Sequence, residues 1–311
     1  MHNHPLNRFT YYARHVLKAL VPGGYYRQQL LKILEENDSE AVRDRVAYYY
    51  RVKGPVELDR RARPFRLRPW RGQSTYQLDF AESLRYFDPD LRVRYVFGDN
   101  ISEPEVPAFV KSRPIVEGPT RAILFNLNRI RHFQFVKDTI PFEAKKNHLV
   151  WRGNACQPHR LNFLETYFTH PLCDVGHFYK RPDPGNPFGK TGMSPAEQLR
   201  CKFVLALEGN DVATNLKWIL SSNSLCVMSP CKYESWFMEG RLVPGVHYVE
   251  VKEDYSDLEE KLEYYRRESG EAEDIVRNAN AWVRQFMDRK REQKILLTLL
   301  WRYFNDSGQL S

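Results

Sequence analysis

Apolar runs alternate with helix-like segments through the second half of the chain, and this alternation constrains the fold most. Five short runs are almost continuously apolar, at 148–153, 173–178, 202–209, 224–229 and 246–251. Helical patterns lie between them at about 158–168, 195–200, 211–222, 232–238 and 256–269. Such strands, alternating with helices, predict a parallel sheet covered by helices on both faces.

The rest of the chain is less regular. Helices are expected at 8–20, 24–36 and 39–52, and strands at 92–100 and 122–128. The helical pattern at 271–304 is too long for one ordinary helix and predicts a bend or two helices. We expect an α/β chain with an N-terminal domain (1–145), a C-terminal domain (146–285) and a final helix (286–311) that packs back on the N-terminal domain.

Composition excludes several classes of protein. With 42% hydrophobic and 14% aromatic residues among 311, the chain is not disordered. We find no run of about 18 apolar residues and no secretory h-region, so a cytoplasmic location is expected. Five cysteines without a CxxC motif predict buried free thiols. The nine histidines form no pair at metal-ligand spacing beyond His2 and His4, so no structural metal is expected.

Positive charge is concentrated in the first half of the chain. Residues 1–150 hold 26 Lys/Arg and 17 Asp/Glu, whereas residues 151–311 hold 21 and 22. The densest stretch, "RRARPFRLRPWR" at 60–71, contains Arg60, Arg61, Arg63, Arg66, Arg68 and Arg71. It is either a solvated basic loop or a surface for a phosphate-bearing acceptor or anionic lipid.

The stretch "ALEGNDVATNLK" at 206–217 joins a strand to a helix. Ligands of doubly wound sheets bind outside the carboxyl ends of the strands, and Gly209 permits close approach of the backbone. Asn210 or Asp211 is expected to cap the helix, Glu208 to accept from ribose hydroxyls, and Lys217 to reach a phosphate or face solvent. The alternative is an ordinary capped corner.

Two further strand ends carry polar residues. "LVWRGN" ends in Arg152, Gly153 and Asn154, and Arg160 lies in the helix that follows. Arg152 suits a phosphate or a strand-end ion pair, and Arg160 is expected on the helix surface. Asp99, directly after an apolar run and Gly98, is either a general base or a turn residue.

Two other motifs are set aside. "GNPFGKT" at 185–191 has three residues between its glycines, where a P-loop needs four. "DPD" at 88–90 precedes a strand instead of following one, so a turn is expected.

Taken together, "VWRGN…PHR", "CKFVLALEGNDVATNLKWILSSNSLCVM" and "ESWFMEGRLVPGVHYVEVKEDYSDLEEKLEYY" resemble the Rumi-like glycosyltransferases. That family includes protein O-glucosyltransferases, capsule-associated proteins and bacterial lipopolysaccharide glycosyltransferases of the LpsA type. The resemblance covers about 95–285 and is strongest at 148–265.

The resemblance implies a GT-B-like fold with two Rossmann-like domains facing across a cleft. It implies inverting transfer from a UDP-sugar without an essential metal or further cofactor, with Asp99 as the base. The implied donor-binding residues are Arg152, Gly153, Asn154, Arg160, Glu208, Gly209, Asn210, Asp211, Ala213, Thr214, Asn215 and Lys217. Eukaryotic members carry an arginine at the position of Asn215, so another cation or helix amides must face the diphosphate.

The acceptor follows from charge and location. We expect a hexosyltransferase that moves glucose or galactose to a lipid-linked lipopolysaccharide core at the inner face of the cell membrane, held peripherally by its basic half. A capsule or protein O-glycosyltransferase is the alternative within the family. A basic nucleic-acid-binding protein is the alternative of another class, but no recognition module is present and no nucleic-acid partner is expected.

Overall fold

The computed structural model of the chain describes residues 8–36, 39–68, 73–178 and 185–310. Contacts divide the chain into two compact units, described separately below. Of the described residues, the first unit comprises those between Gln134 and Cys231 and between Gly240 and Gln285. The second comprises those between Arg8 and Phe133, between Lys232 and Glu239, and between Phe286 and Leu310. The predicted domain limit after 145 falls inside the first unit, whereas the limit after 285 coincides with the end of a unit.

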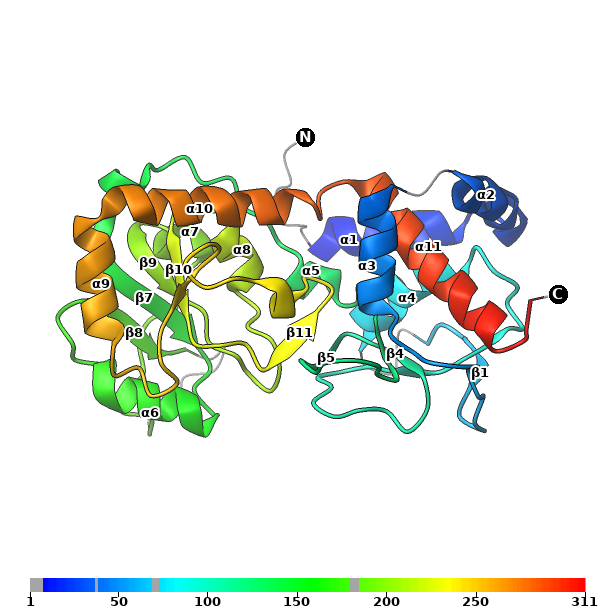
Figure 1. Cartoon of the computed structure of the whole chain (residues 1–311), viewed down its shortest axis with the longest axis horizontal. Helices are drawn as coiled ribbons and strands as arrows, with labels where there is room; N and C mark the ends of the chain where they lie inside the picture. The colour runs from blue at the N-terminus through cyan, green and yellow to red at the C-terminus, as the bar shows by residue number, and fades with distance from the viewer. Residues whose placement is uncertain (1–7, 37–38, 69–72, 179–184, 311) are drawn as a thin grey trace. The chain divides into compact units, whose positions relative to one another are not determined.

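The first unit is built on one parallel sheet of five strands (Figure 1). Its strands are β7 (Lys146–Gly153), β8 (Cys173–His177), β9 (Cys201–Leu205), β10 (Leu225–Met228) and β12 (Val249–Glu250). They lie in the order β12-β10-β9-β7-β8, and every pairing is parallel. The predicted parallel sheet is therefore confirmed. Because β8 lies on one side of β7 and β9 on the other, the strand order reverses between β7 and β9.

Helices follow the strands of this sheet. They are α6 (Pro158–Tyr167), α7 (Pro195–Gln198), α8 (Leu216–Leu220), α9 (Leu258–Arg267) and α10 (Ser269–Arg284). The 3₁₀ turn η1 (Phe142–Ala144) precedes β7, and a second 3₁₀ turn, η2 (Glu239–Arg241), lies where the chain passes from one unit to the other. Pro158 occupies the first turn of α6, where its missing N–H is tolerated. Helix α10 buries Ala272, Ile275, Val276, Ala279 and Val283, the three- and four-residue spacing of one helix face.

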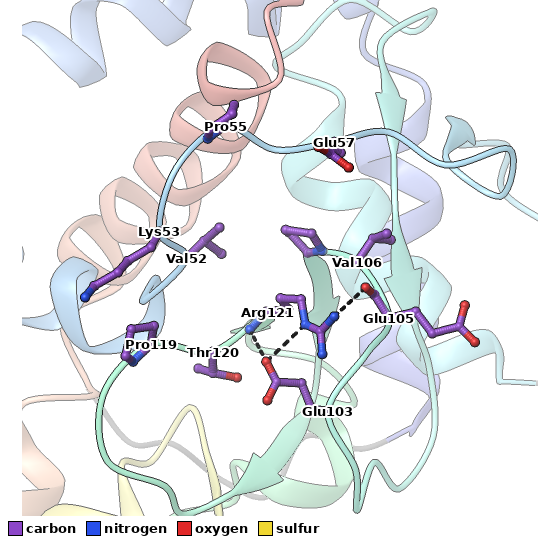
Figure 2. A pocket seen from close by; sticks show the side chains of 11 residues that line it. Val52, Lys53, Pro55, Glu57, Glu103, Glu105, Val106, Pro119, Thr120 and Arg121 are labelled. Carbon is purple, nitrogen blue, oxygen red and sulfur yellow. Dashed lines mark hydrogen bonds and ion pairs between the residues drawn. The ribbon is translucent and has the colours of Figure 1, made fainter.

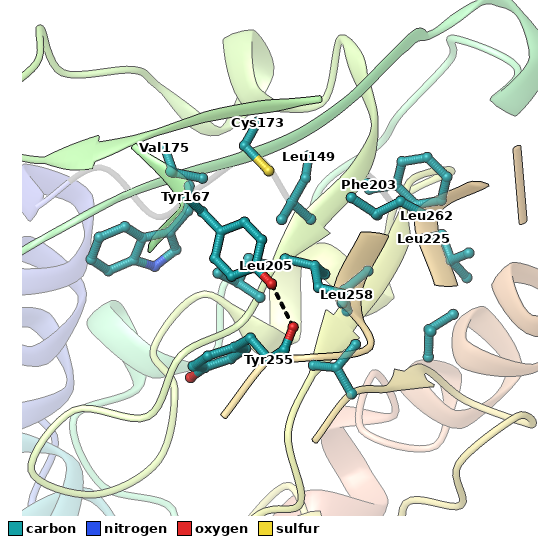
Figure 3. Close-up of a cluster of buried hydrophobic side chains, with 14 of the residues drawn as sticks. Leu149, Tyr167, Cys173, Val175, Phe203, Leu205, Leu225, Tyr255, Leu258 and Leu262 are labelled. Carbon is teal, nitrogen blue, oxygen red and sulfur yellow. Dashed lines mark hydrogen bonds between the residues drawn. The ribbon is translucent and has the colours of Figure 1, made fainter. Parts of the chain in front are cut away.

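Both faces of the sheet are buried, which explains the continuous apolar runs. One face carries Leu149, Phe203 and Leu225, which cluster with Tyr167 of α6 and with Leu258 and Leu262 of α9 (Figure 3). Apolar residues of α10 belong to the same cluster. The alternate residues, among them Val150 and Val204, are equally buried on the other face. Tyr167 joins this core through its hydroxyl, which donates to the Tyr255 carbonyl oxygen at 2.6 Å. Each fully buried Leu or Phe stabilises the unit by about 1.5–3 kcal/mol.

The second unit contains a smaller parallel sheet and two antiparallel pairs. The parallel strands are β3 (Tyr95–Val96), β4 (Ala108–Val110) and β6 (Ala122–Leu124), in the order β3-β4-β6. The antiparallel pairs join β5 (Ser112–Pro114) to β11 (Tyr233–Ser235) and β1 (Arg63–Pro64) to β2 (Arg92–Val93). The three parallel strands follow chain order, so this sheet has no reversal like that of the first unit.

Helices α1 (Arg8–Ala19), α2 (Gly23–Glu35), α3 (Glu40–Tyr49), α4 (Ser74–Leu84), α5 (Arg129–His132) and α11 (Arg289–Asp306) complete the second unit. Helix α11 packs on α2, α3 and α4. The long pattern at 271–304 is split into α10 and α11, as predicted, and Asp288 caps α11 by accepting from the amides of Lys290 and Arg291.

The predicted helix at 232–238 is wrong, because β11 occupies part of it. Glu234 on this strand is buried, and its Oε1 accepts from Arg113 Nε at 2.7 Å. Arg113 also donates to the carbonyl oxygens of Tyr49, Ala122 and Tyr48. A helix at this place would withdraw Glu234 from the buried guanidinium, which costs several kcal/mol for an unpaired buried charge.

Among the residues described, we find no helix long and apolar enough to cross a membrane. The cysteines are free thiols, as expected, but only Cys173, Cys201 and Cys226 are buried. Cys156 is exposed and Cys231 is half-buried, so the prediction of burial is wrong for these two. Burial raises the pKa of the Cys173 thiol to about 12, so this side chain is an inert apolar residue.

Candidate functional site

The residues predicted from two distant stretches come together at one edge of the five-stranded sheet. Strand β7 ends at Gly153 and the neighbouring strand β9 ends at Leu205, so the loops 154–157 and 206–215 leave the sheet side by side. This is the point where the strand order reverses. In open α/β sheets, the loops that diverge at such a point leave a crevice where ligands bind.

Arg160 connects the two loops. Its Nε donates to the Glu208 carbonyl oxygen at 2.8 Å, one terminal nitrogen donates to that of Leu207 at 2.7 Å, and the other donates to that of Asn154 at 2.7 Å. The guanidinium also lies over the Trp151 ring, 5.5 Å from its centroid. Arg160 is thus neither a plain surface residue nor an uncommitted phosphate ligand: it positions both loops.

Two glycines have close neighbours at this corner. A Cβ at Gly153 would lie 2.5 Å from Cζ2 of Trp151, a separation that real side chains do not show. A Cβ at Gly209 would lie 3.3 Å from a terminal nitrogen of Arg160. The backbone at both glycines therefore lies close to the Trp151 and Arg160 side chains. At Gly153 the Trp151 ring leaves no room for any side chain.

Of the two roles expected for Arg152, the structure shows the strand-end ion pair, which it forms with Asp174. Its side chain donates to Asp174 Oδ1 at 2.7 Å and to the Thr191 carbonyl oxygen at 3.0 Å. Burial alone would raise the pKa of Asp174, but hydrogen bonds from Arg152 and Lys190 outweigh it and lower that pKa. The pair fixes the end of β7 to β8.

The 206–217 segment differs from its predicted form. The helix begins at Leu216, with Asn215 at the N-cap position, so neither Asn210 nor Asp211 caps it. The reason is that the Asp211 carbonyl oxygen accepts from the Gly209 amide at 2.9 Å and so turns back toward the strand. Asn215 Nδ2 donates to the Leu205 carbonyl oxygen at 2.8 Å. Helix α8 is only five residues long, and no anion site is assigned to its N-terminus.

The other residues predicted to bind the donor differ in how far they are buried. Asp211, Ala213 and Lys217 are buried, and Lys217 is fully enclosed. Glu208, Thr214 and Asn154 are half-buried, and Asn210 is exposed. Of these predicted residues, the accessible side chains are therefore neutral amides, a hydroxyl and one carboxylate.

Three residues at this corner were not predicted from the sequence. Gln157 Nε2 donates to Asn210 Oδ1 at 3.1 Å, and His159 Nε2 lies 2.9 Å from the Glu208 carbonyl oxygen. His177, at the end of β8, accepts from the Ala155 amide through Nδ1 at 3.1 Å. The position of "QPH" directly before Arg160 was the available signal, because it forms the first turn of the helix after β7.

Asp99 lies in the second unit, after β3. It follows Gly98, whose φ of 103° is costly for other residues. Asp99 Oδ1 accepts from Lys111 Nζ at 2.6 Å; the lysine side chain is buried and the carboxylate is partly exposed. A fixed, partly exposed carboxylate at a strand end has the form that a general base requires.

The arginine-rich stretch is partly neutralised within its own unit. Arg61 pairs with Asp59 and Glu105, and Arg66 pairs with Asp90. Arg60, Arg63 and Arg68 are exposed. Arg71 lies outside the described residues. The surface is therefore less positive than its sequence indicates.

In the described part of the chain, only one group of three or more histidine, cysteine or carboxylate side chains has its ligand atoms close enough together to hold a metal ion. It is formed by His15, Asp79 and Glu82. Arg129 pairs with both carboxylates, and Lys18 pairs with Glu82. The two carboxylates are therefore already paired with protein cations, and we assign no metal site to this group.

A hollow of about 330 Å³ lies elsewhere in the second unit (Figure 2). Arg121 lines it and donates through Nε to Glu103 at 3.3 Å and through a terminal nitrogen to the Glu105 carbonyl oxygen at 2.7 Å. Its other walls are largely prolines and valines. It contains none of the residues predicted for the site, and its arginine and Glu103 satisfy each other.

Comparison with known proteins adds to this geometry. The model of the family described as "Glycosyl transferase family 90" matches residues 127–305. The "O-glucosyltransferase LpsA" of Dichelobacter nodosus is 41% identical over 305 residues, which cover 96% of each chain. The "Uncharacterized protein 035R" of Invertebrate iridescent virus 3 is 32% identical over 111 residues, 35% of this chain and 10% of that protein. The family match includes the whole β7–β9 corner and does not reach Asp99.

Proposed function

The chain belongs to glycosyltransferase family 90 and is a transferase of the LpsA type, and from this premise we propose that it moves a hexose from a UDP-sugar to a lipid-linked lipopolysaccharide core. The acceptor and donor are our proposal. The name of the Dichelobacter nodosus relative favours glucose over galactose as the transferred sugar.

One observation carries this proposal: the two predicted donor stretches meet where the strand order reverses. Arg160 bonds to carbonyl oxygens on both loops there. We propose that Asn154, Asn210 and Thr214 contact the nucleotide, and that Glu208 accepts from the ribose hydroxyls. The half-buried Arg160 and Arg152 and the buried Lys217 then hold the loops in place and lower the electrostatic cost of bringing the diphosphate to this corner.

The chemistry divides between the two units in this proposal. The first unit holds the donor, and the second provides the base and the acceptor surface, as the two domains of a GT-B enzyme do. Asp99 takes the proton from the acceptor hydroxyl while that oxygen attacks the anomeric carbon and UDP leaves. Such a displacement inverts the configuration at that carbon, and Lys111 keeps the carboxylate oriented.

The excess of basic residues in the first half suits an acceptor that carries phosphate or carboxylate groups. An acceptor assembled at the inner face of the cell membrane places the enzyme in the cytoplasm in peripheral contact with that membrane. No cofactor beyond the UDP-sugar and no metal is proposed.

A donor and acceptor panel tests this function. Purified full-length protein is incubated with UDP-glucose, UDP-galactose, UDP-N-acetylglucosamine or GDP-mannose and with truncated lipopolysaccharide cores, with and without EDTA. We expect UDP release and a mass increase of one hexose with UDP-glucose, unchanged by EDTA. Transfer to a protein or capsule acceptor alone would replace the proposed acceptor, and DNA binding without UDP binding would overturn the function.

A further inference from the structure

Helix α1 exposes its apolar side and turns its polar side inward. Val16, Leu17 and Leu20, the last just beyond the helix end, are 63%, 65% and 75% exposed. With Phe9 and Tyr12, which are also exposed, most of these residues follow the three- and four-residue spacing of one helical face. A helix of a water-soluble surface normally has the opposite orientation.

Polar contacts hold α1 in this orientation. On the inner side, the Tyr11 hydroxyl donates to Asp79 Oδ1 at 2.7 Å, and His15 Nε2 lies 3.7 Å from the same atom. Lys18 pairs with Glu82. Tyr11, His15 and Asp79 are buried. These contacts fix the rotation of the helix about its axis, so the exposed apolar face is set by the fold.

The exposed apolar residues continue past the end of α1. Val21 and Tyr25 are exposed, and Leu31 on α2 is 64% exposed. A run of exposed aliphatic and aromatic side chains over two successive helices marks an interaction surface. Tyrosines such as Tyr12 and Tyr25 are typical of side chains at a membrane–water boundary, because their rings are apolar and their hydroxyls are polar.

The charge of this segment selects the partner. Between residues 8 and 34 the sequence has five basic residues and no Asp or Glu. Arg14 and Lys18 pair with Glu82 of α4, whereas Arg8, Arg27 and Lys32 are additional positive charges of the same two helices. A second copy of the chain would bring the same sign of charge to a symmetric contact, which is repulsive. An anionic lipid surface complements both the charge and the apolar face.

We propose that the outer face of α1, continued by Val21, Tyr25 and Leu31, inserts into the headgroup region of an anionic bilayer. The inference deepens the proposed function, on which it rests for the location of the acceptor, by naming the surface that reaches the membrane. It also replaces the arginine-rich stretch as the main membrane contact, because Arg61 and Arg66 there are paired with acidic residues of their own unit.

The test measures binding of the full chain to vesicles without donor or acceptor. Vesicles of phosphatidylcholine alone and of phosphatidylcholine with phosphatidylglycerol are compared by flotation. Val16→Glu/Leu20→Glu places two carboxylates on the proposed face. Val116→Glu/Val243→Glu places two carboxylates at other exposed apolar positions and so matches the change in net charge. Thermal melting of both variants establishes that they fold.

We expect the unmodified chain to bind the anionic vesicles and Val16→Glu/Leu20→Glu to bind at least about tenfold more weakly, with the control variant within about twofold of the unmodified chain. Equal binding by both variants would overturn the proposal. So would a dimer in light scattering that Val16→Glu/Leu20→Glu converts to a monomer, because the face would then be a contact between copies. Sugar transfer to a water-soluble core fragment, assayed in parallel, reports on the proposed function separately.

Discussion

The strand ends of the two units use charge differently. In the first unit, the apolar sheet ends at a corner whose central cation, Arg160, bonds to backbone carbonyl oxygens of two loops. In the second unit, Asp99 is held by one buried lysine, and buried ion pairs such as Arg113–Glu234 recur through the core. The difference shows that a conspicuous cation near a predicted anion site can serve to build the loop itself.

Asp99→Asn is expected to have the largest effect on activity. If Asp99 is the base, turnover falls by about 10²–10⁴-fold, whereas UDP binding by the other unit is unchanged. Asp90→Asn, which alters an exposed carboxylate paired with Arg66 in the same unit, is the control. Steady-state transfer rates and calorimetric UDP titration check the pair. Near-normal turnover by Asp99→Asn would remove this residue from the mechanism.

Arg160→Ala is expected to weaken the β7–β9 corner more than any other change there. It removes hydrogen bonds to three carbonyl oxygens, and we expect a loss of about 2–4 kcal/mol in unfolding free energy and UDP binding at least about tenfold weaker. Arg266→Ala, which removes an exposed pair with Glu263, is expected to change stability by less than about 0.5 kcal/mol. If Arg160→Ala melts normally and binds UDP normally, the connection between the loops is unimportant.

Gly153→Ala tests how tightly the end of β7 is packed, because it adds a single methyl group next to the Trp151 ring. The added methyl would lie 2.5 Å from the Trp151 ring, so we expect a loss of about 1–3 kcal/mol in unfolding free energy. Gly270→Ala in α10 meets no atom within 4 Å and is expected to be neutral or stabilising. Chemical denaturation of the two variants measures the difference, and equal stability would show that the Trp151 ring moves away.

The acid sensitivity of the second unit is the smallest expected effect. Burial lowers the pKa of His15 to about 4 from an ordinary value of 6.5. Because the unfolded chain takes up this proton more readily, the contribution of His15 to stability is complete above about pH 6.5 and is lost as pH falls toward 4. Melting temperatures recorded across this window should fall less steeply for His15→Asn than for the unmodified chain. If melting temperature falls equally steeply with pH in both proteins, His15 does not cause the acid sensitivity. The control is His148→Asn, which replaces an exposed histidine.

The sequence patterns correctly predicted those parts of the fold that depend on local periodicity. The strands β7 and β8, helix α6 and the break between α10 and α11 lie close to where apolar spacing and helix signals indicate. The start of α8 was misplaced, because the bond from the Gly209 amide to the Asp211 carbonyl is not visible in a residue pattern. Likewise, β11 forms because Glu234 meets Arg113, a residue 121 positions away.

The candidate site was predictable in position and not in detail. Gly153 and Glu208 follow apolar runs of neighbouring strands, so their meeting at one sheet edge follows from the pattern once the strand order is known. That Arg160 bonds to carbonyl oxygens, and that Lys217 is buried, depends on how the two loops pack. Such packing has no signature in the spacing of residues.

Hydrogen exchange of the full chain with and without UDP tests the central claim most directly. If the donor binds where the strand order reverses, amides in peptides covering 153–160 and 206–217 become protected when UDP is added. Peptides covering 52–57 and 119–121, which line the hollow of the second unit, remain unchanged. Protection at the hollow, or no protection at the β7–β9 corner at saturating UDP, would contradict the account.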